Sequence, residues 1–265
     1  MATLNKDIFF YHVMKTAGTT VVRLLEQAYG TDASCPLPTH ENADPHPFLG
    51  KVSSPTPLII SGHPDQLFDL WKLAEQRSLP RAKMTFLRHP VDRYLSCYYF
   101  IRRSHYVQKH VGSFDLDLEE ALSCDDRRLA GNMMTKVLSS LGTARDYREP
   151  ATKQDLLQAV KNLKAMDFIG VVEEFDLSYA LLAHEFGFVP PCVTKWNVNA
   201  KYEGRNEISP KLERQIRIMN LFDYELYQFA VELFRARVVE AGERLTSMLA
   251  QITTSDLVYM VKQQT

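Results

Sequence analysis

The sequence has almost no net charge and no cysteine cluster. Its 31 Lys and Arg residues nearly balance its 32 Asp and Glu residues, which gives a formal net charge of −1 at pH 7. Because no positive field extends over the whole molecule, we expect no nucleic-acid partner, and only a local basic pocket is left open. The absence of CxxC spacing argues against a zinc site or a small disulfide framework, since the four cysteines lie far apart at Cys35, Cys97, Cys124 and Cys192.

Long apolar runs are also missing. No stretch reaches the length of a membrane-spanning helix, and residues 1–13 lack the basic segment and apolar stretch of a secretory signal. The sequence therefore predicts no transmembrane segment and a cytoplasmic location. The 265 residues, 45% of them hydrophobic, are enough to bury a sizeable core, and we expect a single domain over residues 1–265.

What is present is an alternation of short apolar runs and amphipathic segments. Three runs predict strands, and each is followed by residues with helical periodicity: 8–13 then 20–29, 58–61 then 66–76, and 84–87 then 91–102. This order predicts an α/β fold, in which helices flank a P-loop-like central parallel sheet and the site lies at the carboxyl ends of the strands.

The second half of the sequence is mainly helical. We expect one more strand at 167–172 and helices at 116–123, 125–138, 153–164, 176–186, 210–219 and 224–250. Residues 31–57 are rich in Pro, Asp, Asn and His and predict an irregular surface excursion, and residues 251–265 are expected to be a tail.

The turn after the first expected strand has the composition of an anion-binding loop. Backbone N–H groups and the positive end of a helix dipole favour an anion there, and the side chains add one positive charge and several hydroxyl donors: Lys15, Thr16, Ala17, Gly18, Thr19 and Thr20. An ATP-type P-loop places its lysine after the second glycine, whereas Lys15 precedes Gly18. An ordinary turn with a solvated lysine is the alternative that this loop alone leaves open.

A second candidate loop follows the expected strand at 84–87 and opens the next helix. Arg88 can direct two N–H groups at one phosphate, and Ser96, one to two helical turns later, can add a hydroxyl. Asp92 and Arg93 could instead form an ion pair at the helix start. We favour that role for Asp92 and leave both roles open for Arg93.

Together these loops resemble those of carbohydrate sulfotransferases of family 2, similar to heparan 2-O-sulfotransferases, which use 3'-phosphoadenosine 5'-phosphosulfate. Residues 15–20 are similar to the family's 5'-phosphosulfate loop, and residues 88–96 to its 3'-phosphate motif, Arg-[Asp/His]-Pro-x-[Glu/Asp]-Arg-x-x-Ser. Weaker matches lie at 132–136, 168–175 and 196–201. The resemblance implies this donor, adenosine 3',5'-bisphosphate as product, and no metal. It also implies that Lys201 meets a phosphate and Tyr202 stacks on adenine, although a solvated lysine is equally consistent.

Sulfuryl transfer to an alcohol needs a proton acceptor near the attacking oxygen. The resemblance implies that His63, in the Gly-His pair after the strand at 58–61, is that base. A helix cap is the alternative role for His63, and His12 is the competing candidate for the base, although it could equally be a core residue. Lys15 is a second catalytic candidate because its charge can stabilise the sulfuryl oxygens.

The acceptor is expected to be a hydroxyl-bearing sugar, glycolipid or small metabolite. The candidates for contacting it are His12, His105 and Arg102. Lys and Arg are too scattered near the site to favour a highly sulfated polysaccharide. Two other functions are left open: an ATP-dependent small-molecule kinase, which would need the forward lysine order and a magnesium-binding carboxylate, and a nucleotide-binding module without catalysis.

Overall fold

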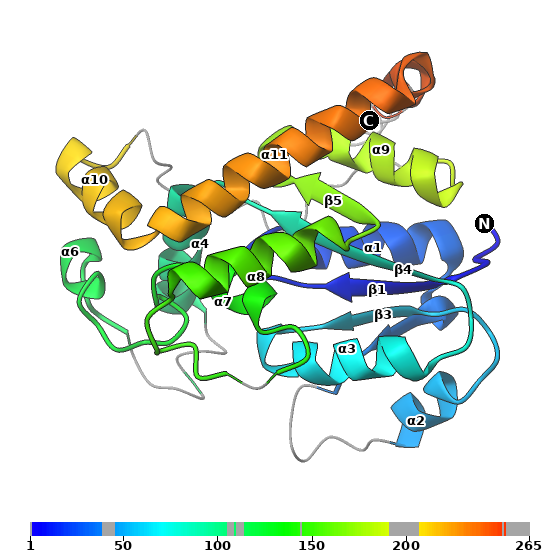
Figure 1. Cartoon of the computed structure of the whole chain (residues 1–265), viewed down its shortest axis with the longest axis horizontal. Coiled ribbons are helices and arrows are strands. Elements are labelled where there is room, and N and C mark those ends of the chain that lie inside the picture. Colours follow the sequence, from blue (N-terminus) through cyan, green and yellow to red (C-terminus); the bar gives the residue numbers. More distant parts are fainter. Residues whose placement is uncertain are drawn as a thin grey trace, which may run out of the picture.

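A five-stranded parallel sheet forms the centre of the protein (Figure 1). The computed structural model describes residues 2–38, 46–104, 109, 114–143, 145–190, 207–250 and 252. The strands lie in the order β2-β3-β1-β4-β5, and all four pairings are parallel. Their bounds are β1 Asp7–Tyr11, β2 Ser34–Pro36, β3 Ile59–Gly62, β4 Arg81–Leu87 and β5 Phe168–Val171. The predicted α/β fold is confirmed.

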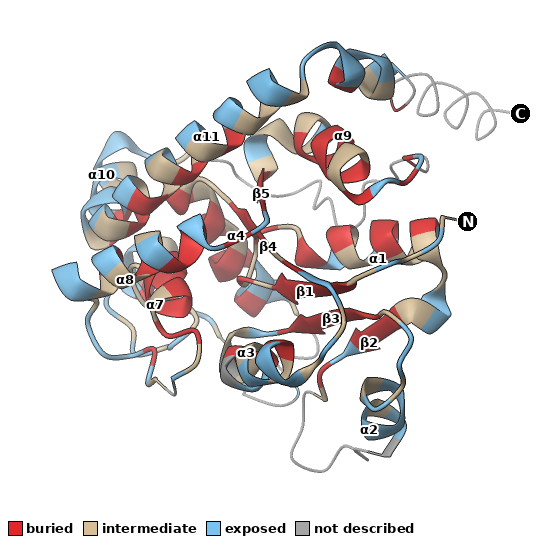
Figure 2. Cartoon of the chain, turned by 45° about the vertical axis from the view of Figure 1, so that its right-hand side comes forward, coloured by how far each residue is buried: buried red, intermediate tan, exposed pale blue. Residues whose placement is uncertain are grey.

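Helices cover both faces of the sheet, which is why its strands are almost continuously buried (Figure 2). The helices are α1 Gly18–Tyr29, α2 His46–Val52, α3 Leu67–Gln76, α4 Pro90–Arg103, α6 Leu118–Ala121, α7 Met133–Ser139, α8 Lys153–Lys164, α9 Phe175–Phe186, α10 Pro210–Met219 and α11 Leu221–Ala241. Along β1, Phe9 and Tyr11 pack toward α3, α7 and α8, whereas Ile8 and Phe10 pack toward α1 and α9. This alternation places one apolar core on each side of the sheet.

Part of the range 31–57 has regular secondary structure, so the expectation of an irregular excursion is wrong for that part. Residues Thr31–Ala33 form a 3-10 turn, β2 pairs with β3 as an edge strand, and α2 follows. Within β2, Cys35 lies opposite Ile60, and the N–H of Leu37 donates to the carbonyl of Ser61 at 2.8 Å. Sequence analysis did not predict this strand, because three residues are too few to show side-chain alternation. The strand is defined by its backbone hydrogen bonds to β3.

Two expected helices are interrupted at residues with positive φ. The segment at 125–138 becomes helical only at Met133, because Asn132 before it is left-handed, with φ of 55°. The segment at 224–250 divides where α11 ends, since Gly242 has φ of 55° and residues 243–250 then form a further helical stretch. The single domain over 1–265 stays a prediction, and of the expected tail only residue 252 is described.

Asn132 and Asp223 cap each other's helices. Asn132 Oδ1 accepts from the N–H groups of Phe222 and Asp223 at 2.9 and 3.1 Å, at the start of α11. Asp223 in turn accepts from the N–H groups of Met134 and Thr135 at 3.1 and 2.7 Å, at the start of α7. The first N–H groups of a helix have no partner within it, so each side chain satisfies donors of the other helix. This exchange fixes α7 against α11.

The strands end on the side of the molecule where α4 and α7 lie, as the arrows of β1 and β3 show in Figure 1. The carboxyl ends of β3, β1 and β4 are neighbours in the sheet, so the segments that follow them meet at one edge. None of the described helices is long and apolar enough to cross a membrane.

Candidate active site

The loop between β1 and α1 has an unusual backbone. Lys15 and Ala17 are left-handed, with φ of 69° and 63°, whereas Thr16 between them is not. A non-glycine residue in this region costs on the order of 1 kcal/mol, and such strain gathers at functional sites. Alternating handedness also turns successive N–H groups toward a common point, which makes a concave site for an anion. The buried Thr16 stabilises the turn, since its hydroxyl donates to the carbonyl of Val13 at 2.8 Å.

The two candidate phosphate loops contact each other. Arg88 Nη1 lies 3.4 Å from the carbonyl oxygen of Lys15 and donates to it. Lys15 Nζ lies 4.2 Å from the centre of the Phe100 ring, which comes from α4. Burial lowers the pKa of Lys15, and the nearby Arg88 guanidinium lowers it further, partly offset by Cys97. Two cations held close together raise each other's free energy, and a bound anion would relieve that cost.

The candidate hydroxyls lie on the helices that follow the two loops. Gly18, Thr19 and Thr20 open α1, where Thr19 is exposed and Thr20 half-buried. Ser96 lies on α4 and is half-buried, two turns after the loop that carries Arg88. The loops at 15–20 and 88–96 thus follow neighbouring strands and meet at Lys15 and Arg88, and the roles of their residues stay predictions.

His12 and His63 lie side by side although they follow different strands. Their ring centres are 4.8 Å apart, and His12 also stacks on Phe10 at 5.5 Å. The His12 ring covers Gly18 so closely that a Cβ there would come within 1.9 Å of it. Burial lowers the pKa of His12 to about 3, with the nearby charges of His63 and Lys15 contributing. His12 is therefore neutral at physiological pH, whereas His63 is exposed at the end of β3.

His63 also occupies the N-cap position of a 3-10 turn at Pro64–Gln66, where it forms a capping box with Gln66. Its N–H donates to Gln66 Oε1 at 3.1 Å, and its carbonyl accepts from the Gln66 N–H at 2.8 Å. The capping role expected for His63 is thus present in the structure, and its role as the base stays a prediction. Gln66 holds the backbone of His63 next to the β1–α1 loop.

The expected ion pair between Asp92 and Arg93 is wrong. Asp92 Oδ2 instead lies 3.8 Å from His89 Nδ1. Arg93 is fully buried, and among the described residues none of its three guanidinium nitrogens has a hydrogen-bond partner. Burial raises the pKa of Asp223, and the charge of Arg93 acts against that rise.

The remaining candidates are dispersed. Arg102 lies in the last turn of α4, where its Nη1 donates to the Tyr98 hydroxyl at 2.7 Å. His105, Lys201 and Tyr202 lie outside the described residues. Within the described ranges, no group of three or more His, Cys, Asp or Glu side chains could hold a metal ion.

Sequence reasoning did not find the contacts that support these loops from a distance. Glu173, in the 3-10 turn Val172–Glu174 after β5, accepts a hydrogen bond from the backbone of His89, which is 84 residues away. Phe100 under Lys15 was likewise not expected. Glu173 does belong to the weak family match at 168–175, but that match does not indicate its partner. Each contact depends on how separate elements dock.

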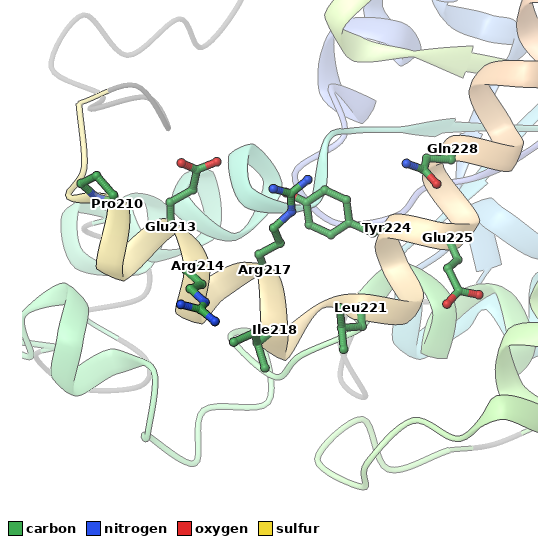
Figure 3. A pocket seen from close by; sticks show the side chains of 9 residues that line it. All are labelled: Pro210, Glu213, Arg214, Arg217, Ile218, Leu221, Tyr224, Glu225 and Gln228. Atoms are coloured by element: carbon green, nitrogen blue, oxygen red, sulfur yellow. The ribbon is translucent and has the colours of Figure 1, made fainter.

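An open groove runs along α10 and the start of α11 (Figure 3). Its volume is about 610 Å³, and its ionisable lining consists of two arginines and two glutamates, Arg214, Arg217, Glu213 and Glu225. The guanidinium of Arg217 lies 4.8 Å from the ring centre of Tyr224, so the groove adjoins the first turn of α11.

Comparison with known proteins identifies the family. The profile described as "Sulfotransferase family" matches residues 2–230, most of the chain. The chain belongs to this sulfotransferase family. The predicted resemblance to a carbohydrate sulfotransferase of family 2 is therefore confirmed.

The curated relatives of this sulfotransferase are named for the 6-O rather than the 2-O position. Heparan-sulfate 6-O-sulfotransferase 2 of Danio rerio is 25% identical over 87% of the chain and 58% of the relative. The Homo sapiens enzymes 2 and 3 are each 25% identical over 87% of the chain, covering 45% and 58% of their own lengths. The chain thus spans about half the length of the curated relatives it matches.

These relatives overturn the expected cytoplasmic location. That expectation rested on the lack of a long apolar run, whereas the heparan-sulfate 6-O-sulfotransferases are Golgi-lumenal. The location prediction is therefore wrong, because it drew a compartment from the absence of a segment.

Proposed function

We propose that this sulfotransferase moves a sulfuryl group from 3'-phosphoadenosine 5'-phosphosulfate to a carbohydrate hydroxyl. The observation that carries the proposal is the meeting of two cationic loops beside an exposed histidine. Arg88 donates to the backbone of Lys15 at 3.4 Å, and His63 follows the strand on the other side of β1. Family membership supports the same donor.

In this proposal the left-handed loop and Lys15 hold the 5'-phosphosulfate, together with the hydroxyls of Thr19 and Thr20. Arg88 and Ser96 hold the 3'-phosphate. Two observations support such a ligand: the backbone is left-handed at Lys15 and Ala17 but not at Thr16, and burial, with a smaller effect of Arg88, lowers the pKa of Lys15. Lys201 and Tyr202 are proposed as further nucleotide contacts on the resemblance alone.

We assign the general base to His63 and not to His12. A base must take a proton near neutral pH, and a pKa of about 3 makes His12 too weak. His63 accepts the proton of the acceptor hydroxyl as that oxygen bonds to sulfur. The bond between sulfur and the bridging phosphate oxygen breaks, and adenosine 3',5'-bisphosphate leaves with the electron pair. Lys15 and the loop hydroxyls stabilise the negative charge on the departing oxygen.

The names of the relatives favour a glycan as acceptor over a glycolipid or small metabolite. Arg102 and His105 remain proposed acceptor contacts. His12 is proposed to line the acceptor side through its contact with His63 at 4.8 Å.

The function is tested by combining nucleotide titration with turnover. We expect adenosine 3',5'-bisphosphate to bind more tightly than ATP in calorimetric titration, and labelled sulfate to pass from the donor to a glycan panel that includes desulfated heparan sulfate. His63→Ala should lose at least a hundredfold in turnover, in line with the usual contribution of a general base, and should keep its affinity for the bisphosphate.

His12→Asn is the matched control, and we expect it to retain measurable turnover. Full turnover by His63→Ala would show that the base is elsewhere. Preference for ATP over the bisphosphate would refute the proposed donor.

A further inference from the structure

One carboxylate joins the second phosphate loop to the last long helix. Glu173 Oε1 accepts from the backbone N–H of His89 at 2.9 Å, and Glu173 Oε2 accepts from the Tyr227 hydroxyl at 2.7 Å. His89 directly follows Arg88, whereas Tyr227 belongs to α11, 54 residues beyond Glu173. Both oxygens of this side chain are therefore used to connect the β4–α4 turn with α11.

Aromatic rings complete the connection. The His89 ring meets Tyr224 and Tyr227 edge to face, with ring centres 5.2 and 5.8 Å apart. Tyr224 also contacts the Arg217 guanidinium of α10, which lies 4.8 Å from its ring centre (Figure 3). His89 is also the N-cap of α4, so holding its peptide sets both the direction of the helix and the position of the residue before it.

The charge of Glu173 cannot explain its place beside a phosphate loop. A carboxylate near a bound phosphate repels it, so Glu173 disfavours an anion unless its contacts with the loop outweigh the repulsion. Arg88 recognises a phosphate through a rigid pair of N–H groups, and such recognition is sensitive to displacements of about 1 Å. A residue that fixes the neighbouring peptide therefore contributes through geometry.

We propose that Glu173 is a positioning residue for the 3'-phosphate: together with Tyr227 it holds the His89 peptide so that Arg88 meets this group. The inference rests on the proposed function, because it assumes that Arg88 binds the 3'-phosphate of the donor. In this role Glu173 acts through the His89 peptide and not by contact with the nucleotide or the acceptor.

The test compares two probes that differ by one phosphate, adenosine 3',5'-bisphosphate and adenosine 5'-phosphate. Calorimetric titration of the full chain gives the affinity ratio of the two for each variant. We expect Glu173→Ala to weaken the bisphosphate about tenfold, the usual size for a lost charge-assisted hydrogen bond, and to leave adenosine 5'-phosphate unchanged. Glu173→Gln, which keeps an acceptor for His89, should restore most of the preference.

The neighbouring Glu174 is the matched control. It carries the same charge one residue away but pairs with Arg235 at 3.3 Å on the surface. Glu174→Ala should therefore retain the wild-type ratio. Tyr227→Phe should lower the ratio by a few-fold, whereas Tyr29→Phe, which removes a hydroxyl bonded to Phe186, should not.

Each outcome has a distinct meaning. If Glu173→Ala loses affinity for both probes equally, or keeps the wild-type ratio as Glu174→Ala does, the positioning role is overturned while the proposed function stands. If the wild-type protein shows no preference for the bisphosphate, the proposed function fails and this inference fails with it.

Discussion

Replacing Gly18 by alanine tests the packing that brings the two histidines together. A Cβ at this position would lie 1.9 Å from two atoms of the His12 ring, whereas ordinary contact begins near 3.4 Å. The ring would have to move by roughly 1.5 Å, the difference between these two distances. The Phe10 and His63 rings both pack against it, with ring centres 5.5 and 4.8 Å away.

We expect Gly18→Ala to destabilise the fold by about 1–3 kcal/mol, the usual cost of forcing an extra carbon into a packed site. A loss of stability would be informative, because a change from glycine to alanine within a helix otherwise stabilises the fold by roughly 0.5–1 kcal/mol. Urea unfolding measures the free-energy change, and the bisphosphate titration shows whether the displaced ring distorts the β1–α1 loop.

The double variant His12→Ala/Gly18→Ala supplies the control. Removing the imidazole makes room for the new methyl group, so the alanine at position 18 should cost little in the His12→Ala background. A coupling free energy of about 1–3 kcal/mol between the two sites is therefore expected. The reasoning is refuted if Gly18→Ala is as stable as wild type, or if its cost is the same with and without His12.

Two further predictions concern helix capping and acid stability. Asn132→Ala removes the acceptor for two α11 donors and puts alanine in a left-handed position, so urea unfolding should show a loss of about 1–3 kcal/mol, and Asn132→Gly a smaller one. The pKa of His12 is about 3 in the folded protein, below its ordinary 6.5, so the unfolded chain binds the proton first as the pH falls. Stability attributable to His12 should be complete above pH 6.5 and decline toward pH 3. His12→Asn should lose less stability than wild type over that range, and equal losses would count against a buried neutral imidazole.

The sequence alone determined the local parts of this protein. Each phosphate-type loop lies between its own strand and helix, so Lys15, Gly18 and Arg88 could be recognised from consecutive residues. The α/β fold follows for the same reason, since apolar runs and helical periodicity are properties of short segments. The helix break at Asn132 did not follow, because the side chain that caps α7 comes from Asp223, 89 residues from Met134.

Only the tertiary structure decided which residues meet. The strand order puts β3 and β4 on opposite sides of β1, and this order brings His63 and Arg88 to the same loop. Burial then makes the two histidines differ, because it lowers the pKa of the packed His12 while His63 stays exposed. The contact of Glu173 with His89 depends on the docking of β5 against β4. Such contacts join residues far apart in the chain, so their energies are absent from any local pattern and arise only when the sheet and its helices have packed.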